Sequence, residues 1–199
     1  MGKSQSGKTT AAVNIVNYLI PSVDHVIVCS PTYQLQHTWD SVRPYVSLHV
    51  DNLSNLTKVL LKYVNNLEGK PFLLVLDDVS SERVLNEGGV GPLNHLAYNA
   101  VWMNCSIVTI CHRVTNIGGG LRENVEHLLI FRTINDKQEK ALAENYSITG
   151  NPKDFRHLFR TIVTEPAFKG NNYAFLYICF VNGTKAYEGF TTQLNFTGQ

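Results

Sequence analysis

A glycine-rich segment near the start of the sequence has residue types and spacing that suit phosphate binding. It fits the pattern G-x-x-x-x-G-K-[ST] at every defined position. The glycines let the backbone curl so that successive N–H groups point at one phosphate, and a following helix adds its positive end. In such a loop the lysine reaches the β- and γ-phosphates, and the threonine hydroxyl binds Mg²⁺. The residues predicted to bind ATP are Gly2, Lys3, Ser4, Gln5, Ser6, Gly7, Lys8, Thr9 and Thr10, with Lys8 also catalytic and Thr9 also a metal ligand.

Two consecutive aspartates follow an apolar run and could supply the acids for hydrolysis. Residues 72–76 read FLLVL, and Asp77 and Asp78 come directly after them. This pattern is typical of a Walker B strand, whose first acid holds Mg²⁺ and whose second orients or deprotonates an attacking water. We therefore predict that Asp77 is a metal ligand and Asp78 is catalytic. The second acid also argues against a simple kinase, which transfers phosphate to a bound hydroxyl.

A polar sensor and a charge-stabilising arginine are the remaining catalytic candidates. Residues 106–111 read SIVTIC and are followed by His112, which would contact the γ-phosphate or the attacking water. Thr109 is the weaker alternative for this role. An arginine that stabilises the transferring phosphoryl group could come from a neighbouring subunit. The candidates for it are Arg83, Arg113 and Arg122.

Short apolar runs alternate with helical spacing, and this alternation predicts the elements that position these residues. It favours an α/β fold with a mainly parallel sheet and helices on both faces, as in P-loop NTPases of the RecA/ASCE type. A C-terminal β-hairpin extends it, and residues 1–199 form a single domain. A strand is expected directly before Gly2 and is missing from this sequence, which favours a truncated or mis-started chain. The expected strands are 25–29, 72–76, 106–111 and 127–131, the helices 9–20, 54–67, 93–103, 136–146 and 151–159, and the hairpin 173–190.

Composition excludes several classes of protein. Lys and Arg number 17 against 16 Asp and Glu, a net charge of +1, so a strongly basic protein that coats nucleic acid is excluded. No apolar stretch is long enough to span a bilayer, and no secretory signal is present, so we expect a protein that is not secreted. The four cysteines contain no CxxC pair. A disulfide scaffold is also disfavoured in a chain of this length with this apolar content. A zinc site from Cys105, Cys111 and His112 is disfavoured, because Cys105 and Cys111 lie six residues apart, which is not ligand spacing.

The ordered series GKSQSGKTT, FLLVLDDV, SIVTICHR, GGLRENVEHLLIF and YAFLYICFVNGTKAYEGF resembles the poxvirus-type genome-packaging ATPases of large DNA viruses and virophages. These belong to the FtsK–HerA superfamily of P-loop DNA-pumping motors. The resemblance implies a homo-oligomeric ring, a hexamer or pentamer, that hydrolyses ATP with Mg²⁺. It would move double-stranded DNA, without sequence preference, into a preformed capsid. Its other partners would be capsid or vertex proteins, and it would be found in the virion and in the viral factory of the host-cell cytoplasm.

The resemblance also assigns roles by position. Arg122 matches the arginine of the family's motif after the third strand, here Leu121-Arg122-x-Asn124, and is a catalytic candidate. His112 stands where the family usually has a glutamine sensor, and a histidine there adds pH sensitivity. Members often carry an arginine just before the third strand, where this chain reads AVWM at residues 100–103. That departure favours Arg122 or Arg113 as the arginine that stabilises the transferring phosphoryl group.

Four other functions can be compared with the sequence. A cellular or plasmid DNA pump of the same superfamily shares the motifs but usually carries extra membrane or clamp domains. A GTPase would need an Asn-Lys-x-Asp base reader, which residues 151–154 (NPKD) imitate with an inserted proline, and a nucleotide kinase would need an arginine-rich lid. A catalytically inert nucleotide- or DNA-binding capsid scaffold would fit the missing strand, but not the intact Lys8, Thr9, Asp77 and Asp78.

Overall fold

The computed structural model describes residues 6–51, 62–78, 92–113, 117, 119–133 and 135–194. The chain divides into two compact units. The parallel-sheet unit contains residues 9–111 and 116–124, and the antiparallel-sheet unit contains residues 1–8, 112–115 and 125–199. The single domain over residues 1–199 stays a prediction.

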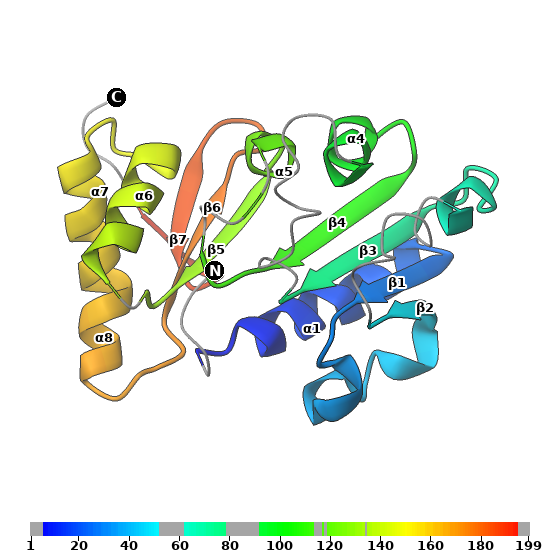
Figure 1. The fold of residues 1–199 in the computed structure, drawn as a ribbon. Helices are drawn as coiled ribbons and strands as arrows, with labels where there is room; N and C mark the ends of the chain where they lie inside the picture. Colours follow the sequence, from blue (N-terminus) through cyan, green and yellow to red (C-terminus); the bar gives the residue numbers. More distant parts are fainter. Residues whose placement is uncertain are drawn as a thin grey trace. The chain divides into compact units, whose positions relative to one another are not determined.

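Four parallel strands in the order β2-β1-β3-β4 form the sheet of the first unit (Figure 1). Three of them confirm predicted strands, whose mostly apolar residues suit a sheet covered on both faces. The strand β2 was not predicted, because its sequence VSLHV mixes polar and apolar residues and is only partly buried. The bounds are β1 His25–Cys29, β2 Val46–Val50, β3 Phe72–Asp77 and β4 Cys105–Ile110.

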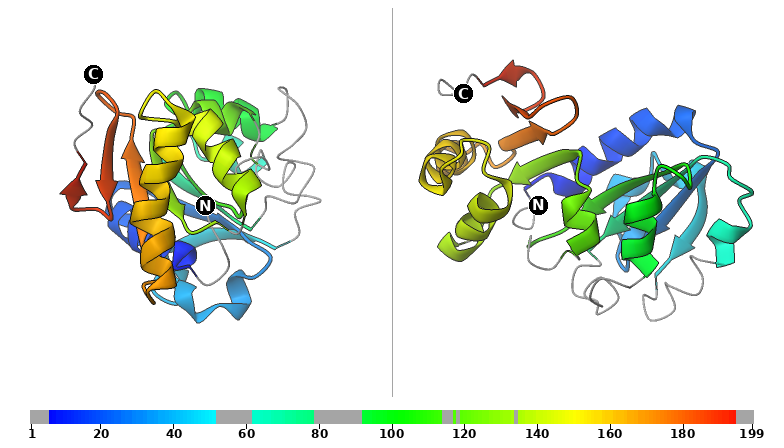
Figure 2. Two further views of the ribbon diagram at one scale, coloured as in Figure 1. Left: turned by 90° about the vertical axis from the view of Figure 1, so that its left-hand side faces the viewer. Right: turned by 90° about the horizontal axis from the view of Figure 1, so that it is seen from above.

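Helices lie on both faces of this sheet, as predicted (Figures 1 and 2). Helix α1 (Lys8–Leu19) packs one face against alternate strand residues; the cluster includes Ala12, Val13, Val16, Val26, Val28, Leu73 and Val75. Helices α4 (Pro92–Asn99) and α5 (Gly119–Glu123) cover the opposite face. Helix α4 ends four residues before the predicted Met103, because residues 100–104 turn back to start β4. Of the predicted helix 54–67, residues 62–65 are helical and residues 54–61 lie outside the described residues.

Three short 3₁₀ turns connect β1 to β2 and are tied together by Arg43. Its guanidinium donates to the carbonyl oxygens of Tyr33, Gln34 and Gln36 and pairs with Asp40 at 2.8 Å. The fully buried Trp39 packs near Tyr33 in the same core cluster as α1. This connection is therefore held in the parallel-sheet unit by hydrogen bonds and by core packing. The turns are Tyr33–Leu35, His37–Trp39 and Arg43–Tyr45, and a further turn, Ile20–Ser22, follows α1.

The second unit is built on an antiparallel sheet in the order β5-β6-β7-β8 (Figure 1). The predicted C-terminal hairpin is confirmed as β6 and β7. The predicted strand 127–131 is also confirmed, as β5, but among the described residues it pairs antiparallel with β6 and not with the parallel strands. The bounds are β5 His127–Phe131, β6 Phe175–Cys179, β7 Lys185–Glu188 and β8 Thr192–Gln193.

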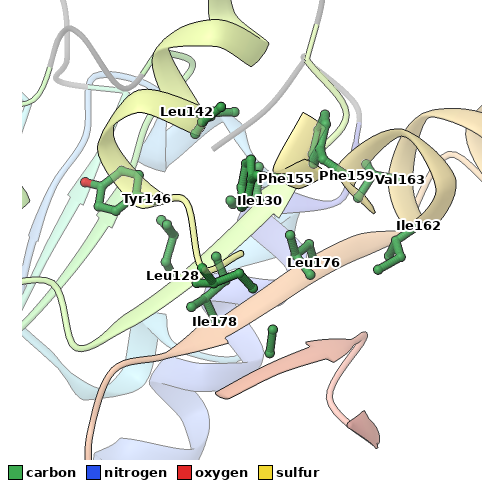
Figure 3. Close-up of a cluster of buried hydrophobic side chains, with 13 residues drawn as sticks. Leu128, Ile130, Leu142, Tyr146, Phe155, Phe159, Ile162, Val163, Leu176 and Ile178 are labelled. Atoms are coloured by element: carbon green, nitrogen blue, oxygen red, sulfur yellow. The ribbon is translucent and has the colours of Figure 1, made fainter. Parts of the chain in front are cut away.

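One face of the antiparallel sheet is covered by helices through a dense apolar cluster (Figure 3). Leu176 and Ile178 of β6 alternate toward it and are fully buried, together with Phe155 and Phe159 of the covering helix. Asn135 and Asn151 cap the two longer helices with their side chains, as their residue type favours. The covering elements are α6 Asp136–Tyr146, α7 Pro152–Phe159, a π-helical turn Arg160–Thr164 and α8 Glu165–Phe168. No helix among the described residues is both long and apolar enough to cross a membrane.

Candidate functional site

The two aspartates after the apolar run lie in different environments. Asp77 is the last residue of β3 and is 3% exposed, whereas Asp78 is exposed. Asp78 has a φ of 56°, a left-handed conformation that ends the strand and that Asp and Asn tolerate better than most residues. Its N–H donates to the carbonyl oxygen of Ile110 at 3.3 Å, which fixes it beside the end of β4. The pair thus offers one buried and one water-accessible carboxylate, as metal binding and water activation require.

Ser30 is a third polar residue at this end of the sheet, and the sequence analysis missed it. Cys29 pairs with Leu76 in the parallel register of β1 and β3, so the residues that follow them are neighbours. The Ser30 hydroxyl donates to Asp77 Oδ2 over 3.4 Å in a buried environment. The signal in the sequence was a small polar residue directly after an apolar strand, but its partner depends on the strand order.

The described part of the glycine-rich segment begins at Ser6; Gly2, Lys3, Ser4 and Gln5 lie outside the described residues. Gly7 has a φ of 83°, and a Cβ there would lie 3.0 Å from Cδ1 of Tyr173. Both observations require glycine at this position, as a phosphate loop does. Ser6 is buried, and Lys8 is 8% exposed at the first residue of α1. Tyr173 is a second residue that the sequence analysis missed, because its contact with Gly7 joins distant parts of the chain.

The remaining predicted residues fall in both units. Thr9 is half-buried and Thr10 exposed in the first turn of α1, in the parallel-sheet unit with Asp77 and Asp78. His112 is half-buried and belongs to the antiparallel-sheet unit, as do Ser6, Gly7 and Lys8. The structure therefore groups the predicted residues into two sets, each held by one unit.

The three arginine candidates differ in how the structure holds them. Arg122 is half-buried on α5, which approaches α4 closely because Gly120 has no side chain: a Cβ there would lie 2.9 Å from Asn94 Oδ1. The hydroxyl of Tyr98 on α4 also donates to Glu123 of α5 at 3.0 Å. Arg113 is exposed, and Arg83 lies outside the described residues. Arg122 is thus the candidate whose backbone is held by packing.

The reactivity of Cys29, the residue before Ser30, reports whether the end of β1 is closed to solvent. Cys29 is fully buried, and burial raises the pKa of its thiol to about 12. Because the thiolate is the reactive form, only about one thiol in ten thousand would be ionised at pH 8. We expect iodoacetamide at pH 8 to modify the half-buried Cys179 of the native protein and to leave Cys29 unmodified, as measured by peptide mass spectrometry.

The control for this labelling is the same protein in guanidinium chloride, where all four cysteines should react. None of the four, all of which are described, is in a disulfide. Modification of Cys29 in the native protein as fast as that of Cys179 would contradict the closed packing around the end of β1.

Solved structures show that the fold is that of P-loop ATPases. The genome packaging NTPase B204 of Sulfolobus turreted icosahedral virus 2, in complex with ATP-gammaS, is 12% identical, covers 97% of this chain and 95% of its own, and has a TM-score of 0.64. B204, the DNA-packaging ATPase from Sulfolobus turreted icosahedral virus, is 13% identical over 94% of each chain, with a TM-score of 0.66. The pCW3 conjugation coupling protein TcpA is 12% identical over 98% of this chain and 59% of its own, with a TM-score of 0.60.

Sequence comparison defines the family. No curated protein matches the chain. Residues 1–178, nearly the whole chain, match the sequence model of the family described as Poxvirus A32 protein. The predicted resemblance to the poxvirus-type genome-packaging ATPases is thereby confirmed, and the chain belongs to the poxvirus A32 protein family.

Proposed function

We propose that this chain is an ATP-hydrolysing motor that translocates double-stranded DNA into a preformed capsid. The observation that carries the proposal is the acid pair at the end of β3: Asp77 is buried and Asp78 is exposed in a left-handed conformation. A metal-binding acid and a water-activating acid need these two environments. Membership of the poxvirus A32 family supports the packaging role, and the B204 structure with ATP-gammaS supports nucleotide binding by this fold.

The residues present fit a magnesium ion bound together with the nucleotide. Thr9 and Asp77 offer a hydroxyl and a carboxylate, the oxygen ligands that Mg²⁺ prefers. The described residues contain no group of three or more His, Cys, Asp and Glu that could hold a metal ion. When bound, the ion would neutralise charge on the phosphates.

The protein groups have separate roles in the proposed reaction. The backbone of residues 2–10 and the ammonium of Lys8 hold the phosphates, and Asp78 orients or deprotonates the attacking water. His112 senses the γ-phosphate by hydrogen bonding. Arg122, supplied to a neighbouring subunit in a ring, stabilises charge on the transferring group.

Translocation without sequence preference requires contacts to DNA phosphates and not to base edges. The loops proposed for these contacts are residues 80–92 and 113–120, most of which lie outside the described residues. Capsid or vertex proteins are the other proposed partners, and the virion and the cytoplasmic viral factory are the proposed locations. The assembly is proposed to be a homo-oligomeric ring, hexameric or pentameric.

Steady-state ATP hydrolysis with and without double-stranded DNA tests this function. We expect DNA of unrelated sequences to stimulate hydrolysis equally, and added salt to reduce the stimulation because the contacts are electrostatic. Nucleotide binding without any hydrolysis, in a protein shown to form rings, would contradict a motor and favour a capsid scaffold. Stimulation by one sequence alone would contradict translocation along any DNA.

A further inference from the structure

Ser30 is fully buried beside the carboxylate that is proposed to hold the metal. Its hydroxyl donates to Asp77 Oδ2 over 3.4 Å. This is longer than the usual hydroxyl–carboxylate distance, but hydrogen bonds in ligand-free active sites often tighten when the ligand binds. On the basis of the proposed function, we propose that Ser30 is a positioning residue, whose hydroxyl holds the Asp77 carboxylate in the orientation that binds Mg²⁺ with the nucleotide.

The backbone of Ser30 is fixed on both sides. Its N–H donates to the carbonyl oxygen of Val50 at 3.1 Å, which continues the pairing of β1 with β2. Its carbonyl oxygen accepts from Nε2 of His49 at 3.0 Å, and the His49 ring packs against Tyr33 with ring centroids 4.5 Å apart. The Cα of Ser30 is therefore held in place, and only its hydroxyl is left to rotate.

The direction of the hydroxyl is set by its other neighbours. The N–H of Thr32 donates to Ser30 Oγ at 3.3 Å, and Thr32 Oγ1 lies 3.4 Å from it. Nε2 of Gln36 donates to Thr32 Oγ1 at 2.7 Å, so the Thr32 hydroxyl is free to donate onward to Ser30. With its oxygen accepting from Thr32, the Ser30 hydroxyl turns its hydrogen to Asp77. The result is a chain of donors, Gln36 to Thr32 to Ser30 to Asp77, that ends on the carboxylate.

A fixed orientation matters because Asp77 has two equivalent oxygens and a rotatable carboxylate. Ser30 engages Oδ2 of this carboxylate. Hydrogen bonds to a ligating carboxylate orient it, and their loss typically lowers metal affinity about 10- to 100-fold. Ser30 should therefore act on the affinity for Mg²⁺ and not on the chemical step.

The test compares Ser30→Ala with Ser47→Ala. Ser47 is an exposed serine of β2 that accepts from the Val26 N–H at 3.4 Å, so it also ties β1 to β2, but far from Asp77 along β1. We measure the Mg²⁺ concentration that gives half-maximal ATP hydrolysis, and the binding of a fluorescent ATP analogue with Mg²⁺ and with EDTA. For Ser30→Ala we expect the half-maximal Mg²⁺ concentration to rise about tenfold. The maximal rate should change less than about twofold, and binding in EDTA should be unchanged. Ser47→Ala should match the wild type.

Ser30→Cys has the same shape with a slightly larger atom and a weaker donor, and its Mg²⁺ requirement should fall between those of the wild type and Ser30→Ala. If Ser30→Ala fails to fold, Ser30→Cys and Thr32→Val decide the question, since Thr32→Val removes the hydroxyl that links Gln36 to Ser30 and keeps the Ser30 side chain. An unchanged Mg²⁺ requirement in the folded Ser30 variants, with a wild type that hydrolyses ATP, would overturn the positioning role alone. A wild type that binds the analogue with Mg²⁺ but does not hydrolyse ATP would overturn the proposed function, while the binding assay would still test Ser30.

Discussion

Asp78→Asn is expected to lower the rate of ATP hydrolysis by about 10²- to 10⁴-fold, the usual contribution of a general base. The substitution removes the charge and the proton-accepting oxygen from the position proposed to activate water. Asparagine also tolerates the left-handed conformation that Asp78 adopts at a φ of 56°. Alanine would add backbone strain to the loss of the carboxylate and would confuse the two effects. Because the Asp78 N–H to Ile110 bond uses backbone atoms, the variant retains it.

Glu68→Gln is the matched control for this variant. Glu68 is also an exposed acid with a positive φ, 52°, and it lies before the opposite end of β3. Its neutralisation changes the same charge without touching the proposed site. Steady-state hydrolysis should fall only for Asp78→Asn, and a fluorescent ATP analogue should bind both variants as it binds the wild type. Hydrolysis by Asp78→Asn at the wild-type rate would assign water activation to another group.

Those parts of the fold that depend on short, uninterrupted patterns were predictable from the sequence. The strand β1 and the helix α6 have the predicted bounds, because Val26 to Cys29 form an apolar run and Asn135 caps a helix-forming segment. The strand β2 was missed because Ser47 and His49 interrupt its apolar residues. It pairs with β1 through backbone hydrogen bonds, and no residue type in the sequence indicates such pairing.

Pairing between distant segments was the main limit. Phe131 of β5 pairs with Phe175 of β6, and the helices α6 and α7 lie between them along the chain. An apolar run alone does not distinguish an antiparallel partner so far along the chain from a parallel neighbour. The strand 127–131 was therefore predicted correctly as a strand but placed among the parallel ones.

The features of the candidate site likewise divide into those that the sequence predicts and those that depend on the fold. Lys8, Asp77 and Asp78 follow from motif spacing, because the chemistry of phosphate and metal binding dictates their types. The hydrogen bond of Ser30 to Asp77 depends on the order of β1 and β3 in the sheet, which spacing does not determine. The left-handed φ of Asp78, which turns it out of the strand, is likewise a property of the backbone.

Lys8→Ala is expected to abolish measurable ATP hydrolysis and to weaken nucleotide binding by about 10- to 100-fold, the value of a hydrogen bond to a charged group. Lys8 is 8% exposed at the first residue of α1. A buried ammonium at a helix N-terminus is disfavoured by desolvation and by the positive end of the helix, and a nearby anion would offset part of this cost. The phosphates of the nucleotide are the proposed anion.

The same argument predicts the stability of the variant. Alanine is the best helix former and introduces no buried charge, so these gains offset the loss of the contacts that Lys8 makes in the protein. Without nucleotide, the unfolding temperature of Lys8→Ala should therefore stay within a few degrees of the wild type. With a nucleotide at about 100 times its wild-type Kd, the wild type gains about 2.7 kcal/mol and the variant gains much less. Differential scanning fluorimetry with and without the nucleotide measures both quantities.

Lys62→Ala is the control, because Lys62 is an exposed lysine in the helical segment 62–65 of the parallel-sheet unit. It should unfold at nearly the wild-type temperature and gain the full stabilisation from the nucleotide. If Lys8→Ala gained that full stabilisation as well, the ammonium would have no part in phosphate binding. If Lys8→Ala without nucleotide had an unfolding temperature far below that of the wild type, the role of Lys8 would be structural. A side chain that only binds phosphate should not be required for the stability of the nucleotide-free protein.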